Sequence, residues 1–176
     1  MIHKLQILPN NKDSFQKLIK FAKIILDICK NLKTIPIVYG GLAYFYYTKD
    51  QNIPVGDLDI LVPESSFQSL IKIFQEKRIK YQEIPKWKSI VCIEDNIKID
   101  IDSIEYCLES NKKDTISVYI ENQEFHILNL ESLIKVYEIS VSSMPETLDF
   151  KKQRELYSTK LNNLKKYSKD FYKNIT

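Results

Sequence analysis

Two aspartates near the middle of the chain have the spacing of a metal-binding pair. Asp57 and Asp59 lie in a predicted strand over 57–62, so both side chains leave the same face. Their separation along the backbone is about 6.6 Å, and at an effective dielectric of 20 the two charges repel by about 2.5 kcal/mol. A divalent cation between them would reverse that cost. The alternative is that Asp57 and Asp59 form the solvated face of an ordinary strand.

A later strand offers a third carboxylate. In the segment 97–104, isoleucines alternate with Lys98, Asp100 and Asp102, so the charged side chains share one face. Only one of the two aspartates fits opposite the earlier pair if the strands lie side by side. The other reading of this face is solvent exposure, with Lys98 pairing its acidic neighbours.

The glycines of the chain are concentrated in one short stretch. Gly40, Gly41 and Gly56 are the only three in the whole sequence, and the first two separate a predicted strand from a predicted helix. A glycine pair there allows a tight turn and a close approach of backbone N–H groups to an anion such as phosphate. A plain tight turn explains the pair equally well. Lys49, Lys98 and Arg154 are candidate phosphate contacts, with solvated or ion-paired lysine and arginine as the alternative.

The surrounding pattern predicts the elements that position these residues. Apolar periodicity and caps predict helices over 13–32, 42–48, 65–77 and 129–140, and a long helix beyond 145. Ser65 and Gln68 resemble a capping box, and Asn129 is a candidate cap. Strands are predicted over 35–39, 57–62, 79–84, 89–94, 97–104, 115–120 and 124–128, with a hairpin turn at Asn122-Gln123. This order predicts an α/β (α+β) fold with a mixed sheet flanked by helices. We expect a domain over 1–140 and a helical extension over 141–176.

Composition narrows the class of protein. The 176 residues carry a net charge of +3 and 44% hydrophobic residues, which is typical of a globular domain. The longest apolar run near the glycines is far shorter than the ~20 residues of a membrane span, so we expect no membrane association and a cytoplasmic location. The three cysteines lack metal-type spacing and are expected to be reduced. The basic, tyrosine-containing C-terminus suggests either a polyanion-facing surface or a solvated amphipathic helix.

The ordered combination of these features resembles a known family. The segments 38–43, 56–62 and 98–101 resemble the nucleotidyltransferase fold of the DNA polymerase beta superfamily, most of all its abortive-infection and minimal nucleotidyltransferase group. The resemblance covers roughly residues 12–140. Within it, Ile99 and Ile101 around Asp100 match the family pattern of an aspartate between apolar residues, which favours Asp100 over Asp102 as the third carboxylate.

The resemblance implies a function and a set of roles. Asp57, Asp59 and Asp100 would bind two Mg²⁺ ions, and Gly40, Gly41 and Lys49 would contact a nucleoside triphosphate. A nucleoside monophosphate would pass to a hydroxyl of a protein, an RNA or a small molecule, with a toxin–antitoxin partner as one expectation. The sequence departs from the family at 53–56, where an Arg and a Thr or Ser are often found. That departure motivates the alternative of a catalytically retired module that binds a protein partner.

Overall fold

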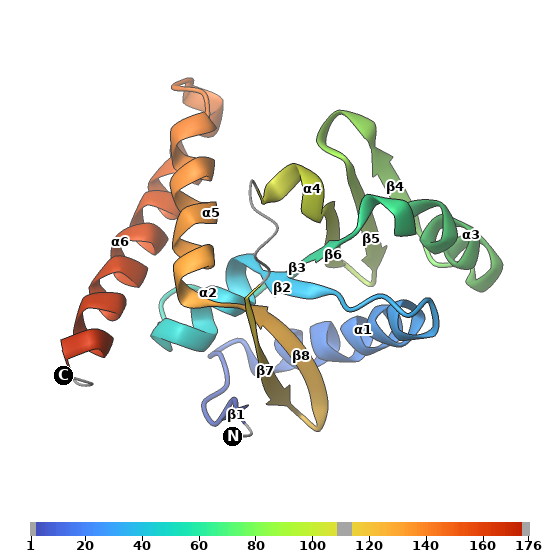
Figure 1. Ribbon diagram of the computed structural model, residues 1–176, viewed down its shortest axis with the longest axis horizontal. Helices are drawn as coiled ribbons and strands as arrows, with labels where there is room; N and C mark the ends of the chain where they lie inside the picture. Colours follow the sequence, from blue (N-terminus) through green and yellow to red (C-terminus); the bar gives the residue numbers. More distant parts are fainter. Residues whose placement is uncertain (1–2, 109–113, 174–176) are drawn as a thin grey trace.

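A single mixed sheet organises the chain. The computed structural model describes residues 3–108 and 114–173, and Figure 1 shows the arrangement of their elements. The strands of the described residues are β1 (His3–Lys4), β2 (Ile37–Tyr39), β3 (Asp57–Val62), β4 (Tyr81–Ile84), β5 (Ser89–Glu94), β6 (Ile97–Ser103), β7 (Thr115–Ile120) and β8 (Gln123–Leu128). They lie in the order β1-β7-β8-β2-β3-β6-β5-β4. The pairs β3/β6, β2/β8 and β1/β7 are parallel and the rest are antiparallel, so the predicted mixed sheet is confirmed.

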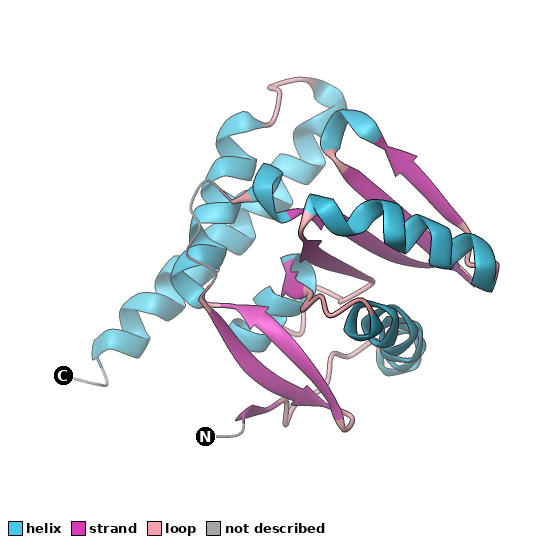
Figure 2. Cartoon of the chain, turned by 45° about the vertical axis from the view of Figure 1, so that its right-hand side comes forward, coloured by secondary structure: helices cyan, strands magenta, loops and turns pink. Residues whose placement is uncertain are grey.

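Helices cover the sheet in two groups. The helices of the described residues are α1 (Lys12–Asn31), α2 (Gly40–Thr48), α3 (Phe67–Lys77), α4 (Ile104–Cys107), α5 (Leu130–Ser143) and α6 (Lys151–Lys173). The first group is α1 and α3, which pack against each other, and α1 also contacts β3 and β6. The second group is α2, α5 and α6, with α5 and α6 forming an antiparallel hairpin (Figures 1 and 2). The predicted helical C-terminal part is therefore confirmed.

Both hairpins turn through two residues with positive φ. Asp95 and Asn96 have φ of 47° and 64°, and Glu121 and Asn122 have φ of 48° and 66°. Two residues in this conformation form the type I′ connection, whose twist matches that of the flanking strands. The second turn was predicted one residue too late, because Asn122 was assigned to its first central position. The asparagine occupies the second position instead.

Several element boundaries differ from the sequence prediction. The helix expected from Leu42 begins at Gly40, so both glycines of the pair belong to its first turn. The capping box predicted at Ser65 is wrong, because a 3-10 turn precedes α3 and no side chain caps that helix. The cap predicted at Asn129 is confirmed, since its side chain accepts a hydrogen bond of 2.8 Å from the Ser132 N–H.

The core determines which face of the central strands is left for chemistry. Leu58 and Ile60 of β3 and Ile99 and Ile101 of β6 are fully buried. Because side chains alternate along a strand, the aspartates between them lie on the opposite face. Two further core residues, Leu161 and Leu164, come from α6, which packs on α2 and α5. The division at residue 140 stays a proposal, and α5 itself continues to Ser143.

The side chain of Trp87 is 51% exposed at the end of the 3-10 turn Pro85–Trp87. Among the described helices, none combines the length and the apolar character that crossing a bilayer requires.

Candidate active site

The three predicted carboxylates meet on the central strands. In the parallel pair β3/β6, Asp59 lies directly beside Asp100, and Asp57 lies beside Lys98. Asp57, Asp59 and Asp100 each offer an oxygen within 4.8 Å of the others. Three carboxylate oxygens at this spacing form a suitable set of hard ligands for a divalent cation. The parallel register thus brings together residues that are about 40 positions apart in the chain.

Asp59 has the most perturbed environment of the three. Its pKa is raised to about 7, mainly by burial and in addition by the charges of Asp57 and Asp100. The backbone N–H of Gly41 donates a 3.2 Å hydrogen bond to Asp59 Oδ2 and opposes the rise. Burial also raises the pKa of Asp100. Neighbouring carboxylates are difficult to ionise at the same time because their negative charges repel. A cation bound between them removes that repulsion, so this set of ligands fits a metal ion.

Gly40 is required by the packing of its own backbone against Asp59. Its φ is +65°, in the left-handed region that favours glycine. A Cβ at this position would lie 2.9 Å from Asp59 Cβ and closer still to the carboxylate. At Gly41, by contrast, a Cβ would meet Asp57 Oδ1 at 3.7 Å, which is ordinary contact. Only the first glycine is therefore sterically obligatory.

Asp102 is already engaged by two neighbours. Its Oδ2 accepts a 2.6 Å hydrogen bond from the Tyr39 hydroxyl, and its Oδ1 accepts a hydrogen bond from Ser89 Oγ. In the register of β3 and β6 it lies beside Leu61, one pleat beyond Asp100. Asp102 therefore links β6 by a hydrogen bond to Tyr39 of β2, the residue that precedes Gly40. The geometry favours Asp100 as the third member of the cluster.

The predicted phosphate contacts are placed differently from one another. Lys98 Nζ forms a 2.7 Å ion pair with Asp100 at the edge of the cluster. Lys49 follows the last residue of α2, where its ammonium donates to the Tyr46 carbonyl and lies 4.3 Å from the Tyr46 ring. Arg154 forms a 2.9 Å ion pair with Glu146. The structure brings only Lys98 to the carboxylates.

Lys160 is a basic residue at this site that the sequence reasoning missed. It lies on α6, is 8% exposed, and its Nζ is 4.0 Å from the Cβ position of Gly41. Burial lowers its pKa, while Asp59 and Asp57 raise it. Its Nζ lies 5.7 to 5.9 Å from the centroids of three tyrosine rings, at 44, 137 and 157. It forms no ion pair within 4.0 Å among the described residues.

A signal for Lys160 was present in the sequence. Tyr157, Leu161 and Leu164 recur at helical spacing, and Lys160 falls on the same apolar face. A lysine is rarely buried among core positions unless its charge is paired with another group. The basic run around it concealed this departure, because α6 carries many exposed lysines.

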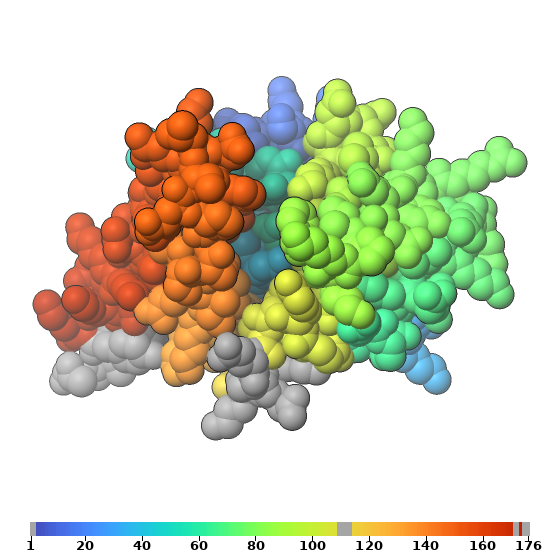
Figure 3. Space-filling view, turned by 90° about the horizontal axis from the view of Figure 1, so that it is seen from above, coloured from blue at the N-terminus to red at the C-terminus, as the bar shows by residue number. Residues whose placement is uncertain are grey.

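Asp57, Asp59 and Lys160 line one cavity of about 610 Å³. Its walls come from α2, β3, β6, α5, α6 and the segment between α2 and β3. The lining comprises Gly40, Gly41, Asn52, Ile53, Pro54, Gly56, Asp57, Asp59, Lys98, Tyr137, Gln153, Leu156, Tyr157 and Lys160. Figure 3 shows the surface hollowed between the α5–α6 hairpin and the β4–β5 side of the sheet. Carboxylates, the N-terminus of a helix and a buried cation therefore share one open chamber, which suits a metal-bound polyphosphate.

Several solved structures that match this fold are described as nucleotidyltransferases or nucleotidyltransferase-like proteins. The antigenic nucleotidyltransferase-like protein from Paracoccidioides brasiliensis matches with a TM-score of 0.59 and 10% identity, over 85% of this chain and 75% of that one. ANT(2'')-Ia in complex with adenylyl-2''-tobramycin matches with a TM-score of 0.57 and 13% identity, over 89% and 98%. The chain has a nucleotidyltransferase fold.

A third neighbour of this nucleotidyltransferase fold is the lincosamide antibiotic adenylyltransferase LnuA with lincomycin bound. It matches with a TM-score of 0.54 and 16% identity, over 83% of this chain and 95% of that one. No family model matches the sequence. No curated protein matches it either. The likeness is thus one of fold, at identities too low to carry a residue's role from one protein to another.

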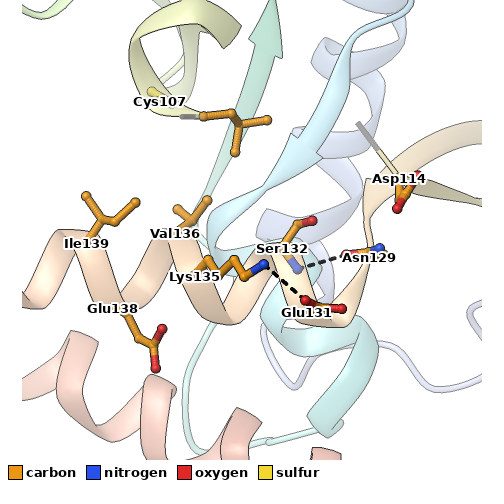
Figure 4. Close-up of a pocket in the computed structure, with 10 residues that line it drawn as sticks. Cys107, Asp114, Asn129, Glu131, Ser132, Lys135, Val136, Glu138 and Ile139 are labelled. Carbon is orange, nitrogen blue, oxygen red and sulfur yellow. Dashed lines mark hydrogen bonds and ion pairs between the residues drawn. The ribbon is translucent and has the colours of Figure 1, made fainter. Parts of the chain in front are cut away.

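The nucleotidyltransferase fold holds a second cavity beside α5, of about 560 Å³ (Figure 4). Its polar groups are mostly paired with one another or with α6. Lys135 forms a 3.0 Å ion pair with Glu131, and Glu138 forms a 2.7 Å ion pair with Lys165 of α6. The three carboxylates of the cluster do not line it. We therefore assign the chemistry to the chamber around Asp59.

Proposed function

We propose that the protein is a metal-dependent nucleotidyltransferase that transfers a nucleoside monophosphate from a nucleoside triphosphate to a hydroxyl acceptor. The observation that carries the proposal is the meeting of Asp57, Asp59 and Asp100 beside the N-terminus of α2. The fold of the neighbours supports the class of reaction. One of them is an adenylyltransferase by name, and another is complexed with an adenylylated antibiotic.

The carboxylates and the basic groups have separate tasks in this proposal. Asp57, Asp59 and Asp100 would hold two divalent ions, with Mg²⁺ expected because the donors are hard oxygens. Bound metal would stabilise negative charge on the attacking and leaving oxygens. Asp100 would accept the proton of the acceptor hydroxyl. The acceptor oxygen then bonds to the α-phosphorus, the bond to the bridging oxygen breaks, and pyrophosphate leaves.

Lys160 supplies the cation that the sequence lacked before Asp57. Its ammonium lies beside Gly41 and within the electrostatic reach of Asp57 and Asp59. A buried ammonium without a carboxylate partner is costly until an anion arrives. We therefore assign Lys160, with the N–H groups at the start of α2, to the triphosphate. In this proposal Lys160 takes the place of the missing arginine, which favours the enzyme over a retired binding module.

The proposal is tested by binding and by labelling. Titration calorimetry of the wild type with Mg²⁺ and non-hydrolysable triphosphates should give micromolar binding. Lys160→Met keeps the length of the side chain but removes its charge, and should weaken binding at least about 10-fold. Lys166→Met, at an exposed lysine of the same helix, is the matched control. Absence of any Mg²⁺-dependent triphosphate binding by the wild type would refute the proposal.

The lining of the chamber does not identify the acceptor, which can be a protein, an RNA or a small molecule. Incubation of wild-type protein, Mg²⁺ and radioactive triphosphate with a cell extract should label one acceptor. The Asp57→Ala, Asp59→Ala double variant should label none, because it lacks two of the three carboxylates. An abortive-infection or toxin–antitoxin role stays a prediction, and a labelled partner encoded beside this protein would support it.

A further inference from the structure

Helices α2 and α6 lie side by side (Figure 1) and meet at two points that are one helical turn apart. At the first point, Lys160 Nζ of α6 lies 4.0 Å from the Cβ position of Gly41 in α2. At the second, Asn163 Nδ2 of α6 donates a 2.8 Å hydrogen bond to the Tyr44 hydroxyl of α2. Residues three apart lie on the same face of a helix, so one face of each helix makes both contacts. The place of Lys160 is therefore coupled to the bond between Asn163 and Tyr44.

The side chain of Tyr44 reaches from one contact point to the other. It is fully buried, and the Lys160 ammonium lies 5.7 Å from the centroid of its ring. Its hydroxyl donates a 2.7 Å hydrogen bond to Asp50 Oδ2, in the segment that follows α2. Asn163 Nδ2 also approaches this carboxylate oxygen, at 3.4 Å. A phenol, a carboxamide and a carboxylate thus form one closed group of hydrogen bonds beside the lysine.

Asp50 extends this group to a third wall of the chamber. Its Oδ1 accepts a 2.9 Å hydrogen bond from the N–H of Asn52, which lines the chamber. The pKa of Asp50 lies below its ordinary value, chiefly because the Tyr44 hydroxyl donates a hydrogen bond to it. Hydrogen bonds to an ionised carboxylate are stronger than those between neutral groups. Asp50 therefore joins α2, α6 and the segment before β3, which are three walls of the chamber.

The Lys160 ammonium depends on such support for its position. Among the described residues it forms no ion pair within 4.0 Å. A lysine ammonium is carried on a flexible four-carbon stem, so without a charged partner its location follows the helix that carries it. The bond from Asn163 to Tyr44 fixes that helix one turn away from Lys160.

We propose that Tyr44, Asp50 and Asn163 are positioning residues that hold the Lys160 ammonium at the start of α2, where the triphosphate binds. This inference rests on the proposed function, because it requires Lys160 to contact the triphosphate. None of the three lines the chamber, so their effect on the ligand passes through Lys160. A cation that is already in place loses less freedom when the ligand arrives, and this strengthens binding.

A double-mutant cycle tests whether these residues act through Lys160. Calorimetry measures the dissociation constant of inorganic tripolyphosphate, in the presence of Mg²⁺, for the wild type, Tyr44→Phe, Lys160→Met and the double variant. Tyr44→Phe keeps the buried ring and removes the hydroxyl, and should weaken binding about 3- to 10-fold. In the Lys160→Met background the same change should alter binding less than about 2-fold, because the lysine through which it acts is gone.

A second variant and a matched control accompany the cycle. Asn163→Leu, at a half-buried position, should reproduce the effect of Tyr44→Phe in both backgrounds and keeps the test open if Tyr44→Phe does not fold. The control is Tyr47→Phe, because the Tyr47 hydroxyl of the same helix donates a 3.1 Å hydrogen bond to the Leu128 carbonyl outside the chamber. Tyr47→Phe should lower the melting temperature about as much as Tyr44→Phe and leave tripolyphosphate affinity unchanged. The Mn²⁺ affinity of all three single variants should equal that of the wild type, because the carboxylate cluster is intact.

Three results would overturn the inference. The first is an unchanged tripolyphosphate affinity in both Tyr44→Phe and Asn163→Leu. The second is an equal loss with and without Lys160, which is the result expected of residues that only stabilise the fold. The third is an undiminished affinity in Lys160→Met. In all three cases the wild type still binds tripolyphosphate and the proposed reaction survives, whereas a wild type that does not bind it would defeat both proposals.

Discussion

The contrast between Gly40 and Gly41 gives the sharpest prediction from the backbone. We expect Gly40→Ala to damage the site and Gly41→Ala to be tolerated, although the two glycines are adjacent. At Gly40, φ is +65° and the added Cβ would lie 2.9 Å from Asp59 Cβ, closer than real Cβ atoms approach. At Gly41, the nearest atoms would be Asp57 Oδ1 at 3.7 Å and Lys160 Nζ at 4.0 Å.

The expected magnitude follows from two contributions at Gly40. Left-handed backbone costs a residue with a Cβ about 1–2 kcal/mol. Retreat of the Asp59 carboxylate breaks its hydrogen bond from the Gly41 N–H, and such a bond to a charged group contributes about 1.5–3 kcal/mol. The sum is about 3 kcal/mol or more, which lowers the melting temperature by about 6–12 °C in a protein of this size. Gly41→Ala should change stability by less than about 1 kcal/mol.

Two measurements check this prediction. Differential scanning calorimetry gives the melting temperatures of both variants, and electron paramagnetic resonance of Mn²⁺ gives the metal affinity. We expect Gly40→Ala to bind Mn²⁺ at least about 10-fold more weakly, because a misplaced carboxylate no longer shares the ion. Gly41→Ala should bind like the wild type. Equal effects of the two variants, or an unchanged Gly40→Ala protein, would refute the steric reasoning.

Further predictions concern the neighbouring side chains. The raised pKa of Asp59 means that the metal-free fold binds an extra proton between about pH 4 and 7, so its stability should fall as pH rises through this window, by at most about 4 kcal/mol. Asp59→Asn should flatten the profile of melting temperature against pH measured without metal, and a profile as steep as that of the wild type would contradict this. Asp100→Asn should abolish metal binding, whereas Asp102→Asn should retain it and lose about 1–3 kcal/mol of stability, as Tyr39→Phe should, by chemical denaturation. The reverse ranking of the two aspartates in Mn²⁺ affinity would show that the wrong one was chosen. Lys49→Met should leave nucleotide affinity unchanged by calorimetry, since Lys49 does not line the chamber, and a marked loss would return it to the site. Leu164→Ala should destabilise the protein by about 2–5 kcal/mol in a denaturant titration, because Leu164 is a fully buried residue of α6, and a change below about 1 kcal/mol would mean that α6 is not part of the cooperative core.

Local sequence patterns were sufficient for the longer helices and strands and for the face that the central strands present, but not for the short elements β1 and α4. Alternation along 57–62 and 97–103 placed the aspartates opposite the isoleucines and leucines of the core, because successive side chains of a strand point to opposite sides. Polar residues, with an asparagine in each, marked the two hairpin turns, where positive φ is required. The position of Lys49 relative to the glycines also follows from the length of the helix between them. A helix from Gly40 to Thr48 is about 13 Å long, which separates Lys49 from the glycines that it was expected to assist.

Tertiary structure alone decided which residues meet. The sequence offered Asp100 and Asp102 on one face, and only the parallel register of β3 and β6 put Asp100 beside Asp59 and left Asp102 to Tyr39. The same holds for Lys160, which reaches the glycine turn because α6 folds back over α2 and α5. Periodicity records how a segment divides between core and solvent, since that division depends on the segment's own side chains. Periodicity does not identify the segment with which a strand or helix packs, because that pairing depends on the packing of the whole core.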